Sequence, residues 1–299
     1  MTHSATGVIR KAVIPVAGFG TRMLPLTKAL PKEMMPICNK PIIQYAVEEA
    51  AASGIEEVIL ITRADKSILE SYFVPNPDLE RFLEDRGREQ ELRLVRDLSS
   101  LVRISTVRQP SPRGLGDALR WARSAVGDET FAVILPDAVV DAHPPVLAQL
   151  MAAYHLHPGC WVATQPVEPA DVSRFGMLEV TSLENASFPG RLFRVSSMIE
   201  KPRTGEAPSN YGVFGRYLLR PEIFDFLDSA QADAKGEIQL TDALAEYCQR
   251  APLYALRFEG MHYDAGDRSG YLQVMLHFAL KDAELGAAVH RLLATLGSN

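Results

Sequence analysis

The strongest constraint on the fold of this chain is an alternation of short apolar runs with amphipathic stretches. Lys11–Val16 and Glu57–Thr62 are typical of buried strands, and Pro41–Ser53 between them is typical of a helix that a glycine ends. The alternation continues with predicted strands at Arg103–Val107 and Phe131–Leu135 and predicted helices at Ser67–Phe73 and Asp117–Ala125. Strands separated by helices predict right-handed crossovers, and therefore an α/β fold with a Rossmann-like, mostly parallel sheet flanked by helices.

The second half of the chain has a looser pattern. The predicted strands there are Trp161–Val167, Leu192–Ile199 and Tyr211–Phe214, followed by two helices and a helical tail over Tyr271–Leu296. Asp78–Leu98 is dense in charges of both signs, which is typical of a solvated helical excursion. Because no repeat or low-complexity linker interrupts the chain, we expect a single domain over residues 1–299. Its core would span about residues 8–270, with a C-terminal helical elaboration at about 271–299.

Composition excludes several classes of protein. The chain has 299 residues, 47% of them apolar, and folding at this length buries about 75% of the surface of the unfolded chain. Cys38, Cys160 and Cys248 are odd in number and form no C-x-x-C pair, which argues against a disulfide framework or a zinc site and favours a reducing cytoplasm.

Charge and hydropathy also exclude some partners. The first eleven residues lack an apolar signal region, and no run of about 18 apolar residues occurs, so we expect neither secretion nor a membrane span. The net charge of −6 and the absence of a basic stripe argue against a nucleic-acid partner.

A glycine loop follows the first predicted strand, where an open parallel sheet binds its ligands. Its residues are Ala17-Gly18-Phe19-Gly20-Thr21-Arg22. Glycine lets backbone N–H groups approach a ligand, so Ala17, Gly18 and Gly20 are candidates for nucleotide binding; a tight turn without a ligand is the alternative. Met23 stands where a dinucleotide fold needs its third glycine, and no Gly-Lys pair of a P-loop is present.

Three cations come shortly after this loop. Arg22, Lys28 and Lys32 fall within eleven residues, among prolines that stiffen the segment. Because like charges repel, such a group predicts a polyphosphate ligand, although Lys28 alone is equally compatible with an ordinary surface position.

Motifs along most of the chain carry a family resemblance. They are Ala17–Pro25, Pro31-Lys32-Glu33-Met34, Asn39-Lys40-Pro41, Arg108-Gln109, Gly114-Leu115-Gly116, Leu135-Pro136-Asp137, Glu200-Lys201-Pro202, Gly215-Arg216-Tyr217, Glu237–Asp242 and Asp264-x-Gly266. In this order, from residue 11 to about 271, they resemble the sugar-phosphate nucleotidyltransferases, above all the bacterial uridylyltransferases that act on glucose 1-phosphate.

The resemblance implies a reaction and roles for the cations. A phosphate oxygen of glucose 1-phosphate would attack the α-phosphorus of UTP and expel pyrophosphate, so positioning and charge stabilisation would carry the rate. Arg22 and Lys32 would neutralise the triphosphate, and Lys201 would hold the sugar phosphate. Gly176 and Glu200 would bind the sugar. Without the resemblance, an exposed ion pair at a strand end is the favoured interpretation of Glu200-Lys201.

The resemblance also implies a metal site. Asp137 follows a predicted strand at the ligand edge of the sheet, where it is either a helix cap or a metal ligand, and Asp264 matches the second metal carboxylate of the family. Two carboxylates together with substrate phosphates favour Mg²⁺ as the cofactor. Relatives are commonly homo-oligomers, which implies a homo-oligomer here.

Gln109 and Gly114 match the segment that reads the base. An amide offers one donor and one acceptor, which fits the O4/N3–H edge that uracil and thymine share, so a thymidylyltransferase is a second hypothesis. Asp117 stands where the uridylyltransferases usually carry His. A third hypothesis is a regulatory paralogue that binds nucleotide sugars with little turnover. A fourth, disfavoured by Met23, is a dehydrogenase that uses NAD.

Overall fold

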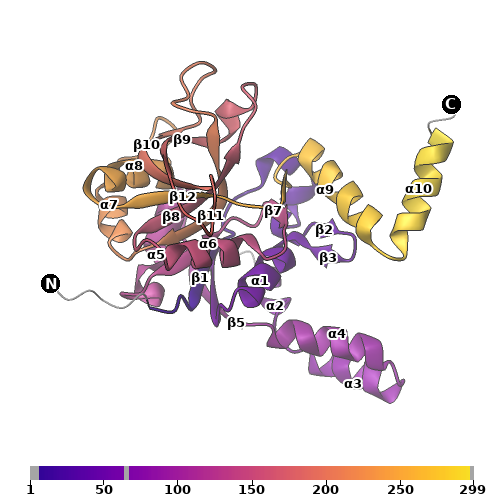
Figure 1. Cartoon of the computed structure of the whole chain (residues 1–299). Coiled ribbons are helices and arrows are strands. Elements are labelled where there is room, and N and C mark those ends of the chain that lie inside the picture. Colours follow the sequence, from indigo (N-terminus) through magenta and orange to yellow (C-terminus); the bar gives the residue numbers. More distant parts are fainter. Residues whose placement is uncertain (1–6, 64–66, 297–299) are drawn as a thin grey trace.

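We describe a computed structural model of the chain, which covers residues 7–63 and 67–296. Nine strands of this part form one mixed sheet in the spatial order β5-β4-β1-β6-β11-β8-β12-β10-β9 (Figure 1). Their bounds are β1 Lys11–Pro15, β4 Glu57–Thr62, β5 Arg103–Arg108, β6 Phe131–Ile134, β8 Cys160–Pro166, β9 Gly176–Leu183, β10 Leu192–Glu200, β11 Tyr211–Leu219 and β12 Leu253–Arg257. The ends of the expected domain, residues 1–6 and 297–299, lie outside the described residues.

The expected parallel arrangement holds in one half of the sheet. β1 pairs in parallel with β4 and β6, and β4 with β5, so the carboxyl ends of these four strands meet at one edge. The other half is largely antiparallel: β9, β10 and β11 follow one another without a helix, and β10 and β11 each pair antiparallel with β9. Strands joined directly can pair only in this way, because a parallel pair needs a long crossover. The predicted α/β class is therefore confirmed, with a mixed sheet.

Helices cover both faces of the sheet. On one face, α1 (Ile42–Ala52) and α6 (Val146–Tyr154) pack on Ala12 and Ile14 of β1. On the other, α5 (Leu115–Val126), α7 (Ile223–Ser229) and α8 (Leu240–Arg250) share a core with Val13, the residue between those two. This alternation follows from the two-residue period of a strand and explains why the strands of the sheet centre are apolar throughout.

Two helical hairpins extend from this body (Figure 1). α3 (Pro77–Asp85) and α4 (Glu89–Ser100) form the charged excursion expected at Asp78–Leu98, after the short helix α2 (Ser67–Ser71). α9 (Arg268–Lys281) and α10 (Leu285–Leu296) form the C-terminal tail. The tail is two helices instead of one because the Asp282 carboxylate accepts hydrogen bonds from the N–H groups of Glu284 and Leu285, which begins a new helix.

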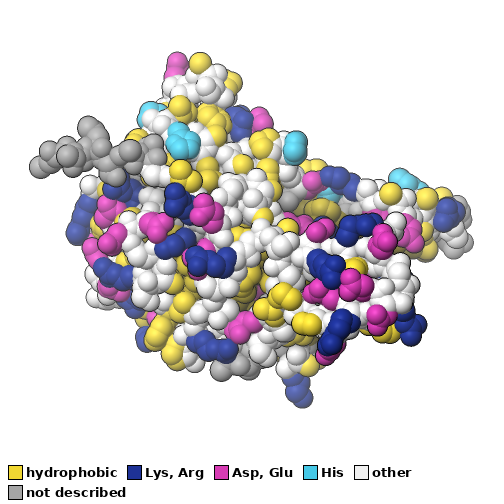
Figure 2. Space-filling model, turned by 90° about the horizontal axis from the view of Figure 1, so that it is seen from below, with side chains coloured by type: hydrophobic (Ala, Val, Ile, Leu, Met, Phe, Trp, Pro, Cys, Tyr) yellow, Lys and Arg dark blue, Asp and Glu magenta, His cyan; other side chains and the backbone are white. Residues whose placement is uncertain are grey.

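Two small sheets complete the fold. β2 (Pro36–Ile37) pairs with β3 (Lys40–Pro41), and β7 (Ala138–Asp141) pairs antiparallel with β13 (Met261–Asp264). In the face that Figure 2 shows, basic and acidic side chains are interspersed. Within the described residues, no helix has both the length and the apolar character that crossing a membrane requires.

A buried ion pair fastens helix α1 to the sheet. The Arg216 guanidinium, 2% exposed, donates to both carboxylate oxygens of Glu49 at 2.8–3.1 Å and to the carbonyl oxygen of Leu135. The Glu49 carboxylate also accepts from the backbone N–H of Leu147 on α6. The Glu49 carboxylate therefore connects α1 and α6 to Arg216 on β11. Arg216 in turn bonds the segment that leads to Asp137.

We predict that Glu49→Ala lowers the free energy of unfolding by about 3–5 kcal/mol, because it leaves the Arg216 charge buried without its partner. The matched control is Glu48→Ala on the same helix, whose pair with Lys40 is partly exposed and should be worth at most about 1 kcal/mol. Urea unfolding followed by circular dichroism measures both values. Equal, small losses in the two variants would contradict the structural role given to Glu49.

Candidate active site

The glycine loop leaves β1 at the carboxyl edge of the sheet. Gly20 has φ +65° and begins a short 3₁₀ turn at Thr21, and its carbonyl oxygen accepts a hydrogen bond from the Thr27 hydroxyl. A side chain at Gly20 would be strained by this conformation, whereas the space beside Gly18 is open. A cavity of about 570 Å³ lies against the loop, with Gly18, Phe19, Thr21, Lys28 and Arg63 among its lining residues. The loop therefore presents open backbone, and Lys28 faces the same cavity.

Two cations and two carboxylates meet beside this loop. Lys32 Nζ lies 2.6 Å from Asp137 Oδ2, and Arg22 lies 4.0 Å from Asp137 and 3.6 Å from Asp264. Asp137 immediately precedes β7 and Asp264 ends β13. These strands pair with Asp264 opposite Ala138, and the Ala265 N–H donates to the Asp137 carbonyl at 2.8 Å. The pairing thus joins two carboxylates that lie far apart in the sequence.

The Lys32–Asp137 pair is charged in both partners. Burial by itself would raise the pKa of Asp137, but the Lys32 ammonium and, more weakly, Arg22 hold this pKa below the usual value of an aspartate. Burial acts to lower the pKa of Lys32, and the attraction of Asp137 outweighs it, so this pKa is raised. Asp137 is therefore a carboxylate and Lys32 an ammonium at neutral pH.

The carboxylates of Asp137 and Asp264 converge on one point. A Cβ atom at Gly266 would lie 2.8 Å from Asp137 Oδ2, 2.9 Å from Asp264 Oδ1 and 2.9 Å from Arg22 Nη2. Among the residues that the structure describes, no three His, Cys, Asp or Glu side chains form a metal-binding group, so the chain offers two carboxylates here. That donor set fits Mg²⁺, which prefers oxygen and is usually completed by water and substrate phosphates.

The structure adds one charged residue that the sequence did not indicate. Arg174 Nη2 lies 3.0 Å from Asp264 Oδ2 and 2.7 Å from Asp267 Oδ2. It ends the short 3₁₀ helix Val172–Arg174, two residues before Gly176 at the start of β9. His262, two residues before Asp264, has a structural position: it packs against Phe175 and Phe214, and burial lowers its pKa to about 4.

The candidate sugar-binding residues form a second group. A Cβ at Gly176 would lie 3.3 Å from the Glu200 carboxylate, and the Thr241 hydroxyl donates to that carboxylate at 2.7 Å. Lys201 Nζ lies 2.6 Å from Glu200, so the ion pair considered from the sequence is present in the structure. Lys201 also has φ +44°, a backbone conformation that a residue with a side chain rarely adopts and that is concentrated at functional sites. Thr241 lies in the Glu237–Asp242 motif, which the sequence did not assign to the site, and its hydroxyl holds the carboxylate in place.

The candidate base-reading residues form a third group. Gln109 directly follows β5, and its amide donates to the Asp117 carboxylate at 2.6 Å. Gly114 precedes α5 with φ +93°, and a Cβ there would lie 2.6 Å from the carbonyl oxygen of Ile238. Gly114 is therefore required for the loop to pass the backbone of Ile238. The carbonyl oxygen of Ile238 also accepts a hydrogen bond from the N–H of Gly116 at 2.8 Å.

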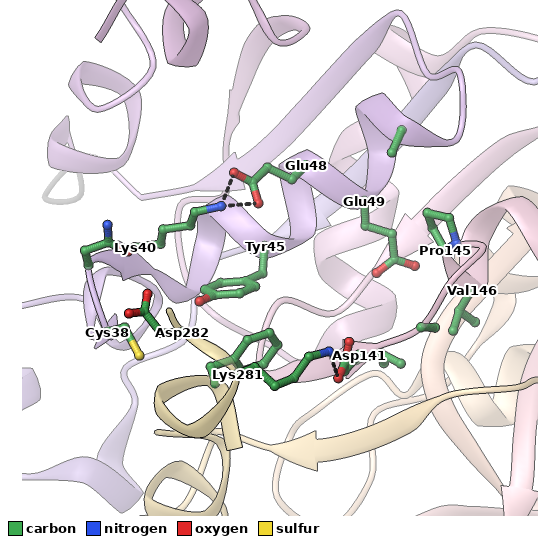
Figure 3. Close-up of a pocket in the computed structure, with 15 residues that line it drawn as sticks. Cys38, Lys40, Tyr45, Glu48, Glu49, Asp141, Pro145, Val146, Lys281 and Asp282 are labelled. Atoms are coloured by element: carbon green, nitrogen blue, oxygen red, sulfur yellow. Dashed lines mark hydrogen bonds and ion pairs between the residues drawn. The ribbon is translucent and has the colours of Figure 1, made fainter. Parts of the chain in front are cut away.

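A second cavity, of about 440 Å³, lies between α1, β7 and α9 (Figure 3). Its two lysines point to carboxylates of its own wall, Lys40 to Glu48 at 2.8 Å and Lys281 to Asp141 at 2.6 Å (Figure 3). None of the site residues predicted from the sequence lines it. Because its lysines are already paired with wall carboxylates, this cavity is a weaker candidate for a polyphosphate than the edge of the sheet.

An α/β sheet that brings a glycine loop, cations and two carboxylates to one edge fits a protein that handles nucleotide phosphates. Comparisons with known proteins identify the class. The family model described as nucleotidyl transferase matches residues 11–280, and the chain belongs to this family of nucleotidyltransferase enzymes.

Three relatives illustrate the similarity. The UTP--glucose-1-phosphate uridylyltransferase of Bacillus subtilis is 44% identical over 277 residues, which are 93% of each chain. A UDP-glucose pyrophosphorylase structure complexed with UDP-glucose has a TM-score of 0.84 and 37% identity, covering 92% of this chain and all of that one. A UTP-bound enzyme from Acinetobacter baumannii has a TM-score of 0.85 and 36% identity, covering 96% of this chain and 99% of that one.

We predict that Gly266→Ala lowers kcat by about 10²-fold and leaves folding nearly unchanged. The new methyl group would occupy the point on which the two carboxylates and Arg22 converge, and displacing one charge-stabilising group costs about that much. Because the crowded atoms are ends of flexible side chains, the fold can adjust, and thermal unfolding should change little. The matched control is Gly7→Ala, which adds the same methyl group where no atom lies within 4 Å, ahead of β1 and at its opposite end from the glycine loop. A Gly266→Ala enzyme with the wild-type rate would contradict the convergence.

Proposed function

We propose that the protein is a UTP–glucose-1-phosphate uridylyltransferase, which transfers UMP from UTP to glucose 1-phosphate in a reaction that depends on Mg²⁺. The single observation that carries the proposal is the convergence of Asp137, Asp264 and Arg22 beside the glycine loop, with Lys32 on Asp137. The names of the relatives support the choice of substrates.

In the proposed reaction, a phosphate oxygen of glucose 1-phosphate forms a bond to the α-phosphorus of UTP. The bond from this phosphorus to the bridging oxygen breaks, and pyrophosphate leaves with the electron pair. Both substrates are polyanions, so the barrier depends on how well the site offsets their repulsion and the charge that develops on the leaving group. Arg22, whose side chain is 59% exposed, is placed to offer a planar fork to phosphate oxygens. Lys32 offers a point charge beside Asp137.

Asp137 and Asp264 would hold the Mg²⁺, whose chemistry there is to offset negative charge on phosphate oxygens. Asp137 lies close to both Lys32 and Arg22, and Asp264 lies close to Arg22. The same carboxylates therefore also orient both cations. The Arg174 guanidinium donates hydrogen bonds to the carboxylates of both Asp264 and Asp267, and it thereby fixes the orientation of the Asp264 side chain.

Glu200 and Lys201 would receive the sugar phosphate. The Glu200 carboxylate, oriented by Thr241, is a strong acceptor for sugar hydroxyls. Lys201 is more than half exposed, so its ammonium can leave Glu200 for a phosphate at little cost. The positive φ of Lys201 fixes the direction in which its side chain leaves the backbone. The residue is therefore suited to positioning the attacking phosphate.

Features beyond the site support the wider proposal. All three groups of candidate residues are arranged around one nine-stranded sheet, which supports a single catalytic domain.

The projecting tail carries exposed apolar side chains, which supports a homo-oligomer whose size light scattering measures. They are Leu272 and Leu276 on α9 and Leu292 and Leu296 on α10. The three cysteines are free thiols, which supports a cytoplasmic enzyme.

The direct test is release of pyrophosphate with four nucleotides crossed against several sugar 1-phosphates, with Mg²⁺ and with a chelator. We expect the highest kcat/KM with UTP and glucose 1-phosphate, and no turnover with the chelator. A higher value with dTTP would make the protein a thymidylyltransferase. Binding of UDP-glucose without turnover of any pair would make it a regulatory paralogue.

We predict that Asp137→Ala and Lys201→Ala each lower kcat by about 10²–10³-fold, the range for removing one preorganised charge-stabilising group. The matched control is Lys281→Ala, which removes a lysine that lies at the same 2.6 Å from its carboxylate but in the second cavity. Initial rates at saturating substrate measure all three. Near wild-type rates for both test variants would show that the site is placed wrongly.

A further inference from the structure

Arg174 joins two carboxylates through one nitrogen atom. Its Nη2 donates to Asp264 Oδ2 at 3.0 Å and to Asp267 Oδ2 at 2.7 Å, and its Nη1 lies 3.6 Å from Asp171. The Arg174 side chain is 43% exposed, and ion pairs with this exposure contribute little to folding. The arrangement therefore calls for an explanation in the site, where Asp264 is a candidate metal ligand.

The two carboxylate oxygens of Asp264 have different neighbours. Oδ2 faces the guanidinium of Arg174 at 3.0 Å and that of Arg22 at 3.6 Å. Oδ1 accepts a hydrogen bond from the Gly266 N–H at 2.9 Å, and it is the oxygen that faces the point of convergence with Asp137. Rotation of the carboxylate about its Cβ–Cγ bond would turn Oδ1 away from that point. The bond to Arg174 opposes this rotation and so holds Oδ1 where a metal would meet it.

Asp267 holds the guanidinium of Arg174 in turn. It is the N-cap of α9: its Oδ1 accepts from the Gly270 N–H at 2.9 Å, and its Oδ2 accepts from Arg174. Because the next residue, Arg268, donates to the carbonyl oxygen of Leu24 at 2.9 Å, this end of α9 is bonded to the segment that follows the glycine loop. The guanidinium is therefore held at a fixed place.

The backbone of Arg174 belongs to the candidate sugar-binding group. Arg174 lies directly before Phe175, whose carbonyl oxygen accepts a hydrogen bond from the Lys201 N–H at 3.1 Å. The next residue, Gly176, pairs with Glu200 across β9 and β10. The Arg174 side chain thus extends from the candidate sugar-binding group to a candidate metal carboxylate.

We propose that Arg174 and Asp267 are positioning residues that hold Asp264 in the orientation that a metal requires, and in register with the sugar-binding strand β9. This inference rests on the proposed function, because it assumes a divalent cation at Asp137 and Asp264. The charges of Arg174 and Asp267 offset each other, so the pair orients Asp264 without adding net positive charge that would repel a metal. Loss of such an outer contact typically weakens metal binding by about 10–100-fold.

The test is Arg174→Lys, which keeps the charge but replaces the planar guanidinium by one ammonium group on a flexible stem. We expect the Kd of Mn²⁺ to rise about 10-fold, measured with UDP-glucose present from the electron paramagnetic resonance signal of the free ion. The Mg²⁺ concentration that gives the half-maximal rate should rise by the same factor. The kcat at saturating Mg²⁺ and the KM for UTP should stay within about 3-fold, because the chemistry and the nucleotide contacts are unchanged.

The matched control is Arg220→Lys. Arg220 is 39% exposed and donates to both carboxylate oxygens of Glu222, at 2.8 and 3.2 Å. It follows Leu219, which pairs with Phe131 at the start of β6, so it lies at the edge of the sheet opposite to Asp137. This variant should change neither the Kd of Mn²⁺ nor the dependence of the rate on Mg²⁺.

A second variant, Asp267→Asn, separates positioning from folding. Asparagine caps a helix as well as aspartate does, so thermal unfolding should change little. Its NH₂ end cannot accept the bond from Arg174, so the Kd of Mn²⁺ should rise. In the double variant with Arg174→Lys, the rise should be smaller than the product of the two single factors, because both changes break one contact.

An unchanged or lower Kd of Mn²⁺ in Arg174→Lys overturns the inference, and the proposed function stands if the wild type converts UTP and glucose 1-phosphate. If Arg174→Lys fails to fold, an unchanged Kd in Asp267→Asn overturns the inference in the same way. A wild type that binds no Mn²⁺ overturns both the inference and the reaction that depends on Mg²⁺.

Discussion

In the proposed reaction two phosphate esters repel each other, and the account depends on how the protein offsets that repulsion. We propose that it does so at one edge of the sheet, where Lys32 lies 2.6 Å from Asp137, and Arg22 lies 4.0 Å from Asp137 and 3.6 Å from Asp264. Cations alone would repel one another, and carboxylates alone would repel phosphate. Placed together, they keep each other charged and oriented, and they leave between them the space that a side chain at Gly266 would fill.

The rest of the molecule holds these groups in register. Pairing of β7 with β13 sets Asp137 beside Asp264, and the buried Glu49–Arg216 pair fixes the segment that leads to Asp137. The stretch from Ile238 to Thr241 connects the candidate sugar-binding group with the candidate base-reading group. Ile238 bonds the backbone of the loop before α5, and Thr241 orients Glu200. One short stretch before and within α8 thus serves both ends of the proposed nucleotide sugar.

The sequence alone predicted the α/β class and the strands β1, β4 and β6 to within a residue, because buried strands between helices are uniformly apolar. In the other half it predicted β8 and β10 to within a residue but missed β9 and β12. It did not predict the antiparallel pairing there, because strand order depends on long-range contacts. Motifs supplied the candidate residues, and the structure arranges them in three groups. Arg174 was missed because its partner Asp264 lies 90 residues away, and no local pattern marks such a contact.

The most direct test of the central claim is a crystal structure with UDP-glucose and Mg²⁺ bound. The account predicts the metal on Asp137 and Asp264, and the diphosphate between Arg22 and Lys201. A diphosphate bound elsewhere, for example in the cavity between α1 and α9, with no metal on these two aspartates, would contradict it.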